Sequence, residues 1–290
     1  MRLRLRHFLH PIRSTKSLYF MIRRLLERYF AERQICSKIR RGHVTHCWCG
    51  GELLPFKWHP SYGVCAECGC YVNRHPPLNL KELYSFDFYW HIVQKFHGNL
   101  PIEQRAKAYK ADGRVDYWLK LIQYYGPPHG TVIEVGCAPG ILLSELQAKG
   151  YECIGVEPDR KTAEWIQQNM KVKVRSGFFP DIDLPNCDLF LAFDVLEHSP
   201  NPDRFMQKIA QLLNPGGIAI IQTPIERYGY EPPFGEAFKS AFKEFEHLFL
   251  FTNKAMEMLA DLSGLEIIEA NERLCCHHEI CIFRKPHLES

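Results

Sequence analysis

The sequence of 290 residues lacks any uninterrupted apolar run of about 18 residues, the length that a membrane-spanning helix requires. It also lacks an apolar signal segment near its start, where arginines alternate with leucines from Arg2 to Arg6. Neither an internal repeat nor a low-complexity tract is present. We therefore expect a folded cytoplasmic protein, with room for one full domain and a smaller module.

Positive charge is scarce outside residues 1–41, which we term the basic arm. The arm holds twelve Lys or Arg and two acids, a net charge of +10, so the rest of the +3 chain carries −7. A helix predicted over 17–35 has arginines on much of its surface and these apolar residues on one face: Leu18, Ile22, Leu25, Leu26 and Tyr29. Such a helix packs on its own domain or a partner, lies on an anionic membrane surface, or binds nucleic acid. We expect the arm to serve localisation, peripheral to a membrane, and not chemistry.

The 12 cysteines lack the distribution of a disulfide scaffold. Five fall between Cys47 and Cys70, and the others are scattered, several of them in apolar runs that predict buried strands. Clustered thiols in a reducing compartment indicate a metal site. We therefore predict that residues 42–78 form a metal-binding module.

The predicted metal ligands are two close pairs of cysteines, each followed by glycine. Cys47 and Cys49 form the first pair, and Cys65 and Cys68 form the second, with 15 residues between Cys49 and Cys65. This spacing is typical of a zinc ribbon, in which four thiolates hold the metal tetrahedrally and leave no open position. The predicted role is therefore structural, or in binding an acceptor. The first pair is one residue short, so His46 or Cys70 remains an alternative ligand.

Strand and helix patterns alternate from residue 131, after an aromatic-rich connector over 76–101 and a helical pattern over 103–125. This alternation predicts a doubly wound α/β domain, over residues 79–290, with a mostly parallel sheet and a closing antiparallel hairpin. The expected strands lie at 132–135, 153–156, 172–174, 189–193, 218–222, 265–268 and 280–283.

The first predicted strand leads into a glycine loop that lacks the dinucleotide-binding fingerprint. Gly136 and Gly140 are present, but Ala138 and Ile141 stand where that fingerprint needs glycine. Glu134 also lies at the end of the strand. A carboxylate there suits a cationic ligand without phosphate better than it suits a pyrophosphate.

The loop resembles motif I of class I S-adenosylmethionine-dependent methyltransferases, and three later motifs follow in the order of that family. They are Gly155-Val-Glu157-Pro158-Asp159, then Asp194-Val-Leu196-Glu197-His198, then Asn214-Pro215-Gly216-Gly217. The resemblance covers about 131–225 and is to the small-molecule enzymes of the family. It implies bound S-adenosylmethionine, with Glu157 on the ribose hydroxyls. The cofactor-binding residues that it implies are Glu134, Gly136, Ala138, Gly140, Glu157, Pro158, Gly177, Phe178, Asp194 and Leu196.

One departure from the family lies after the third strand, where many relatives carry an acid and this chain has Ser176-Gly177-Phe178-Phe179. We expect backbone groups and an aromatic face to hold the adenine there. A sulfonium methyl is already activated, so the protein mainly aligns donor and acceptor and excludes water.

Two histidines are predicted near the acceptor, at the carboxyl edge of the sheet. We favour His247 as a general base, if the acceptor is a hydroxyl that needs one, with His198 as the second choice. Glu246 could orient the His247 ring, and Tyr228 and Tyr230 could shape the pocket.

Three functions remain open. A small-molecule methyltransferase, acting on a sugar, a glycan precursor or a related metabolite, agrees best with the motifs. A zinc-containing ribosomal RNA methyltransferase would use the basic arm on phosphates, but the net charge of −7 elsewhere disfavours nucleic acid. The third is a non-catalytic binding protein on the same fold. The terminal Cys275-Cys276-His277-His278 is interpreted as a hairpin turn and not as a second metal site.

Overall fold

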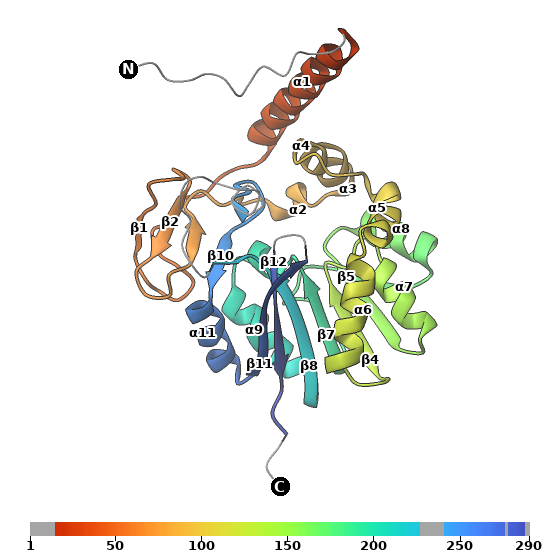
Figure 1. Cartoon of the computed structure of the whole chain (residues 1–290). Coiled ribbons are helices and arrows are strands. Elements are labelled where there is room, and N and C mark those ends of the chain that lie inside the picture. Colours follow the sequence, from red (N-terminus) through yellow and green to blue (C-terminus); the bar gives the residue numbers. More distant parts are fainter. Residues whose placement is uncertain (1–14, 227–240, 276–277, 288–290) are drawn as a thin grey trace.

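The computed structural model describes residues 15–226, 241–275 and 278–287 of the chain, which form two β-sheets surrounded by helices (Figure 1). Tyr228, Tyr230, Cys276, His277 and the first 14 residues of the basic arm lie outside the described residues. No helix of the described part is long and apolar enough to cross a membrane.

The larger sheet has seven strands in the order β11-β12-β8-β7-β4-β5-β6. Its strands are β4 (Thr131–Val135), β5 (Glu152–Glu157), β6 (Lys173–Ser176), β7 (Cys187–Phe193), β8 (Leu213–Thr223), β11 (Glu266–Cys275) and β12 (His278–Arg284). The first five are parallel, and β12 runs antiparallel to both β8 and β11. The predicted mostly parallel sheet with an antiparallel C-terminal hairpin is therefore confirmed.

Alternate residues of each central strand enter different cores. On β4, Val132 packs with the helices α6 (Arg114–Tyr125), α7 (Ile141–Ala148) and α8 (Arg160–Met170), whereas Ile133 packs with α9 (Pro202–Leu212) and α11 (Asn253–Ser263). This alternation follows from the period of two along a strand. It covers both faces of the sheet, so the carboxyl edge is left for a ligand.

The smaller sheet joins the cysteine-rich segment to a distant part of the chain. Its order is β1-β2-β3-β10-β9, with β1 (Leu53–Pro55), β2 (Tyr62–Cys65), β3 (Tyr71–Asn73), β9 (Ile225–Glu226) and β10 (Phe249–Thr252). Phe249 of β10 is paired with Val72 of β3. Cys47, Cys65 and Cys68 also belong to the core that packs under the larger sheet. The cysteine module, residues 42–78, is thus continuous with the α/β domain.

Short helices form the predicted aromatic connector. They are α2 (Leu80–Leu83), α3 (Phe86–Phe88), the π-helix η1 (Tyr89–Val93) and α4 (Gln94–Phe96). The helical pattern predicted over 103–125 is two helices, α5 (Ile102–Ala111) and α6, because Gly113 breaks it in the left-handed conformation at φ +81°. The helix predicted over 17–35 is α1 (Thr15–Lys38), which projects from the body (Figure 1).

Candidate active site

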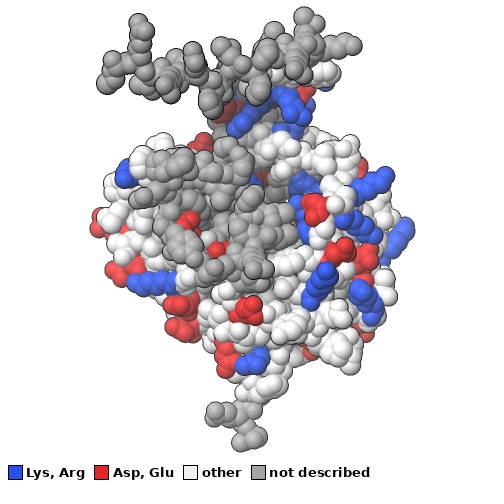
Figure 2. Space-filling view, viewed as in Figure 1, with Lys and Arg blue, Asp and Glu red and all other residues white. Residues whose placement is uncertain are grey.

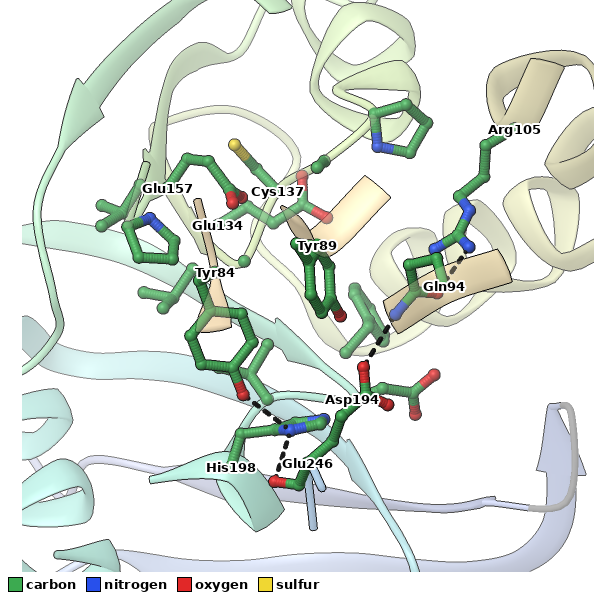
Figure 3. A pocket seen from close by; sticks show the side chains of 18 of the residues that line it. Tyr84, Tyr89, Gln94, Arg105, Glu134, Cys137, Glu157, Asp194, His198 and Glu246 are labelled. Carbon is green, nitrogen blue, oxygen red and sulfur yellow. Dashed lines mark hydrogen bonds between the residues drawn. The ribbon is translucent and has the colours of Figure 1, made fainter. Parts of the chain in front are cut away.

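A cavity of about 440 Å³ lies at the carboxyl edge of the larger sheet (Figure 3). The ends of β4, β5 and β7 form one side of it, and the segment from α2 to α6 forms another. Of the ten predicted cofactor-binding residues, eight line this cavity: Glu134, Gly136, Ala138, Glu157, Pro158, Gly177, Phe178 and Asp194. The structure therefore brings together most of the side chains that the motifs single out.

Gly140 and Leu196 do not line the cavity. Gly140 begins α7 in the left-handed conformation, and a Cβ there would meet Ile166 of α8. Leu196 is fully buried in the core of the larger sheet. Both residues shape loops beside the cavity rather than its wall.

The glycine loop turns sharply because Gly136 is left-handed, at φ +66°. Its N–H donates to the carbonyl of Val156 at 2.9 Å, which fixes the loop against β5. A Cβ at Gly136 would lie 2.5 Å from Cγ2 of Val195. A side chain there would therefore collide with the loop after β7, as well as straining the backbone.

Replacing Gly136 by Val is expected to lower affinity for S-adenosylmethionine at least tenfold and to destabilise the fold by about 2–4 kcal/mol, from strain plus the collision. Gly264 is the matched control, because its φ of +68° is nearly the same and a Cβ there meets nothing. Gly264→Val should cost only the strain and leave affinity unchanged. Calorimetry measures the cofactor affinity, and thermal unfolding measures the stability. Equal cofactor affinity in the two variants would contradict the placement of the cofactor.

Two buried carboxyl groups meet in the cavity behind the glycine loop. Burial raises the pKa of Glu157 to about 8, although the Ala138 N–H opposes this. Burial and the neighbouring Glu157 hold the pKa of Glu134 well above its ordinary value. Asp159, by contrast, accepts a bond from the Thr162 N–H at 2.8 Å and caps α8. Glu157 is therefore the acid of its motif that remains available to a ligand.

Glu134 Oε2 is buried and has no hydrogen-bond partner among the described residues. An orphaned carboxyl oxygen is costly unless a ligand donates to it. Together with Glu157, it fits a ligand that is cationic and carries hydroxyl groups, as S-adenosylmethionine does.

Cofactor affinity should rise with pH up to about 8. Ribose hydroxyls donate more strongly to a charged carboxylate than to a neutral one, so binding requires Glu157 to lose its proton. The rise is at most about tenfold per pH unit for one proton. Titration calorimetry between pH 6 and 9 tests this, and Glu157→Gln should flatten the dependence. A flat profile in the unmodified protein would argue against Glu157 as the ribose ligand.

Both predicted histidines line the cavity, with ring centroids 4.9 Å apart. His198 follows β7 in the short helix η2 (Leu196–His198), and its Nδ1 lies 3.0 Å from the hydroxyl of Tyr84 and 3.0 Å from the carbonyl of Glu246 (Figure 3). His247 is 1% exposed, and its Nδ1 lies 2.6 Å from the carbonyl of Ala241.

The two rings differ in what they can do. Burial lowers the pKa of His247 well below its ordinary value, so this ring is a weak base. The prediction that Glu246 orients it is wrong, because the Glu246 carboxyl accepts from Gln94 and its carbonyl contacts His198 instead. A bond from Nδ1–H of His198 to that carbonyl leaves Nε2 with the lone pair.

A third histidine in the cavity was interpreted from the sequence as part of a turn. His278 begins β12, and its Nδ1 donates to Asp194 Oδ1 at 2.7 Å. Asp194 sits in the left-handed conformation at φ +58° and also accepts from Gln222 Nε2 at 2.9 Å. Although burial opposes it, the charge of His278 lowers the pKa of Asp194 to about 2. A strained residue held by two partners is typical of a functional position.

The wall facing the sheet comes from the connector, which the sequence did not mark as functional. Tyr84 and Tyr89 present aromatic rings to the cavity, while Gln94 links two other elements (Figure 3). Its Nε2 donates to Glu246 Oε1 at 2.8 Å, and its Oε1 accepts from Arg105 Nη2 at 2.7 Å. The aromatic density of 76–101 was the available signal.

The four predicted metal ligands come together in the cysteine module. The sulfurs of Cys47 and Cys68 lie 3.6 Å apart and those of Cys49 and Cys65 3.4 Å apart, and all four lie within 4.8 Å of one another. Tetrahedral zinc–thiolate geometry needs sulfurs about 3.8 Å apart. The alternative His46 is exposed, with Nδ1 against the Thr45 hydroxyl.

Comparisons with known proteins agree with this geometry. A family model described as a methyltransferase domain matches residues 105–270. The chain belongs to this methyltransferase domain family. The matched segment includes the glycine loop, both buried carboxyl groups, His198 and His247, and it ends before His278.

Curated relatives of this methyltransferase domain are distant. A ubiquinone biosynthesis O-methyltransferase of Rickettsia prowazekii is 24% identical over 154 residues, which cover 50% of this chain and 60% of that protein. An uncharacterized methyltransferase of Mycobacterium sp. (strain JLS) is 29% identical over 160 residues, which cover 54% and 59%. The chain thus matches about three fifths of the length of these relatives. A solved structure assigned as an O-methyltransferase, from Nostoc punctiforme, superimposes with a TM-score of 0.54 at 18% identity over 63% of this chain and 60% of that one.

Proposed function

We propose that the protein transfers a methyl group from S-adenosylmethionine to a hydroxyl of a small-molecule acceptor. The observation that carries this proposal is one cavity in which a glycine loop and two buried carboxyl groups face a histidine and two tyrosines. Membership of the methyltransferase domain family supports the cofactor. The O-methyltransferase name of the Rickettsia relative supports oxygen as the acceptor atom.

In this proposal the ends of β4 and β5 hold the cofactor. Glu157 accepts bonds from the ribose hydroxyls, and the orphaned oxygen of Glu134 accepts from a cationic donor group. Phe178 offers its ring to the adenine. When bound, S-adenosylmethionine supplies an activated methyl group.

The acceptor would occupy the side lined by Tyr84, Tyr89 and His198. In this proposal Nε2 of His198, which lies 3.9 Å from the buried Glu197 Oε1, takes the proton of the acceptor hydroxyl as the hydroxyl oxygen becomes the nucleophile. The helices from α2 to α5 exclude water from the reacting atoms. Aromatic walls with a few polar groups suit a sugar, a glycan precursor or a related cyclic metabolite.

The test is methyl transfer from deuterated-methyl S-adenosylmethionine to small molecules of a cell extract, read by mass spectrometry. We expect one or a few species to gain a labelled methyl group with the unmodified protein and none with Glu157→Ala. Failure to bind S-adenosylmethionine by calorimetry would exclude the proposed activity.

We also propose that Cys47, Cys49, Cys65 and Cys68 bind one zinc ion. Their sulfur separations support four-thiolate coordination, which leaves no open position for catalysis. Metal analysis of protein purified without chelators should find about one equivalent. Free native thiols at all four positions would exclude the site.

A further inference from the structure

The helix α1 is divided into a part that packs on the body and a part that does not. Ala31 and Ile35 are buried, and Ile35 packs with Leu83, Phe88 and Val93 of the connector. The preceding residues of the helix project away from the body (Figure 1). Among the described residues, eight of the fifteen exposed large apolar side chains belong to this projecting segment: Tyr19, Phe20, Met21, Ile22, Leu25, Leu26, Tyr29 and Phe30.

The apolar side of the projecting segment faces away from the protein. At about 100° per residue, the stripe centred on Ile22, Leu25 and Tyr29 lies about 130° round the helix from Ala31 and Ile35. Those two residues mark the side that docks on the body. Leu25 is 61% exposed and Tyr29 51% exposed. The stripe therefore does not pack against the chain's own core.

The C-terminal end of this segment also contacts the body, through side chains outside the apolar stripe. Arg28 lies over the Phe96 ring, with its guanidinium carbon 5.0 Å from the ring centroid. Glu27 accepts from Arg23 at 3.0 Å and lies 3.6 Å from Lys95 of α4. These contacts fix the rotation of the helix, so the apolar stripe stays outward.

Charge decides what can cover this stripe. Residues 1–41 carry a net charge of +10 against −7 elsewhere, and Figure 2 shows Lys and Arg side chains gathered on α1 above a body of mixed charge. Two such arms would repel each other, which disfavours a second copy of the chain. Nucleic acid would use the arginines but not eight exposed apolar side chains. A continuous apolar stripe flanked by arginines is the pattern of a helix lying in an anionic membrane surface.

We propose that residues 19–30 of α1 insert their apolar stripe into an anionic lipid surface, with the arginines at the headgroups. The C-terminal part of α1 packs on η1 and α4, which contain cavity-lining residues such as Tyr89 and Gln94. Docking therefore places the connector side of the cavity next to the membrane. This inference is independent of the methyl-transfer proposal.

The test is sedimentation of the full chain with phosphatidylcholine vesicles that contain or lack phosphatidylglycerol. We expect binding only with phosphatidylglycerol, weakening as salt increases. Leu25→Asp/Leu26→Asp should lower the affinity at least tenfold, because both leucines lose their burial in lipid. Leu54→Asp/Leu262→Asp is the matched control, since both leucines are exposed elsewhere and the charge change is the same.

An unchanged thermal unfolding temperature in each variant shows that its fold is intact. Equal binding to neutral vesicles, or equal loss in the control variant, would overturn the proposal. So would a dimer of the unmodified chain, found by analytical ultracentrifugation, that Leu25→Asp/Leu26→Asp dissociates, because the stripe would then join two copies.

Discussion

Replacing His198 by Gln lowers turnover by about 10²-fold or more and leaves affinity for S-adenosylmethionine unchanged. The reason is that Gln keeps the size and a hydrogen-bonding group but cannot take a proton. The cofactor lies on the β4 and β5 side of the cavity in our proposal, so its affinity does not depend on this ring. Steady-state kinetics with the acceptor found in the extract screen, together with calorimetry, measures the two quantities.

The choice of His198 over His247 reverses the preference drawn from the sequence. Position after the fifth strand favoured His247, but that ring is 1% exposed and its pKa is lowered by burial. The His198 side chain is 15% exposed and is oriented at Nδ1 by Tyr84 and Glu246. A base needs access to the acceptor as well as a neutral ring.

His247→Gln is the matched control for this prediction. It should lower stability through loss of the bond to the Ala241 carbonyl, with a smaller effect on kcat. Tyr84→Phe should lower kcat, because it removes one of the two partners that orient the His198 ring at Nδ1. Near-normal turnover in His198→Gln with a 10²-fold loss in His247→Gln would return the role to His247.

Local sequence patterns were sufficient to predict the larger sheet. The strands β4, β5 and β7 are short apolar runs, each followed by a helical pattern, and parallel strands connected in this way leave few alternatives. The positions where helices end depend on single residues. The pattern over 103–125 read as one helix because Gly113 costs only about 1 kcal/mol in a helix, whereas the structure uses it in a left-handed turn.

The missed parts of the site depend on contacts between distant segments. Helices as short as α3 and α4 are unstable alone, so no local pattern predicts them; packing over the cavity forms them. The pairing of β3 with β10 joins Val72 to Phe249. Both strands are too short for their sequences to predict which strand each pairs with. His278 was overlooked for the same reason, since its partner Asp194 lies 84 residues earlier.

Removing zinc from the proposed site abolishes methyl transfer while S-adenosylmethionine still binds. From the cysteine spacing alone we predicted a structural role or one in binding an acceptor, with the metal needed for local folding rather than for methyl transfer itself. In the structure, β3 pairs with β10. The chain just before β10 contributes Lys243, Glu246 and His247 to the cavity. The cysteine module thus supports the acceptor side of the site.

Side chains of the module bind that segment directly. Tyr62 donates its hydroxyl proton to the carbonyl of His247 at 2.9 Å, and Asn73 Nδ2 donates to the carbonyl of Glu244 at 2.8 Å. The Thr252 hydroxyl donates to the carbonyl of Cys68 at 2.6 Å. These bonds hold the chain at Glu244 and His247, before β10, and at Thr252, at the end of β10. Since Cys68 is a proposed zinc ligand, loss of the metal is expected to weaken the contacts at both places. Among the residues that the structure describes, no hydrogen bond joins the glycine loop or Glu157 to the module.

Chelation followed by zinc addition avoids variants that fail to fold. We expect turnover to fall more than 10²-fold on chelation and to recover with zinc, because a displacement of about 1 Å in a site can already cost 10²-fold. Cofactor affinity should change less than about twofold. Cys65→Ser should behave as the chelated protein does, and Cys36→Ser is its control, because Cys36 is an exposed thiol outside the cluster.

Asn73→Ala separates positioning from metal binding. This variant keeps all four cysteines but loses the bonds to the Glu244 and His247 carbonyls, so it should keep its zinc and its cofactor affinity while turnover falls about tenfold. Unchanged turnover in both Asn73→Ala and the chelated protein would show that the module does not support the acceptor side. Loss of cofactor affinity on chelation would instead show that the metal holds the whole fold, because β3, β10 and the larger sheet would then unfold together.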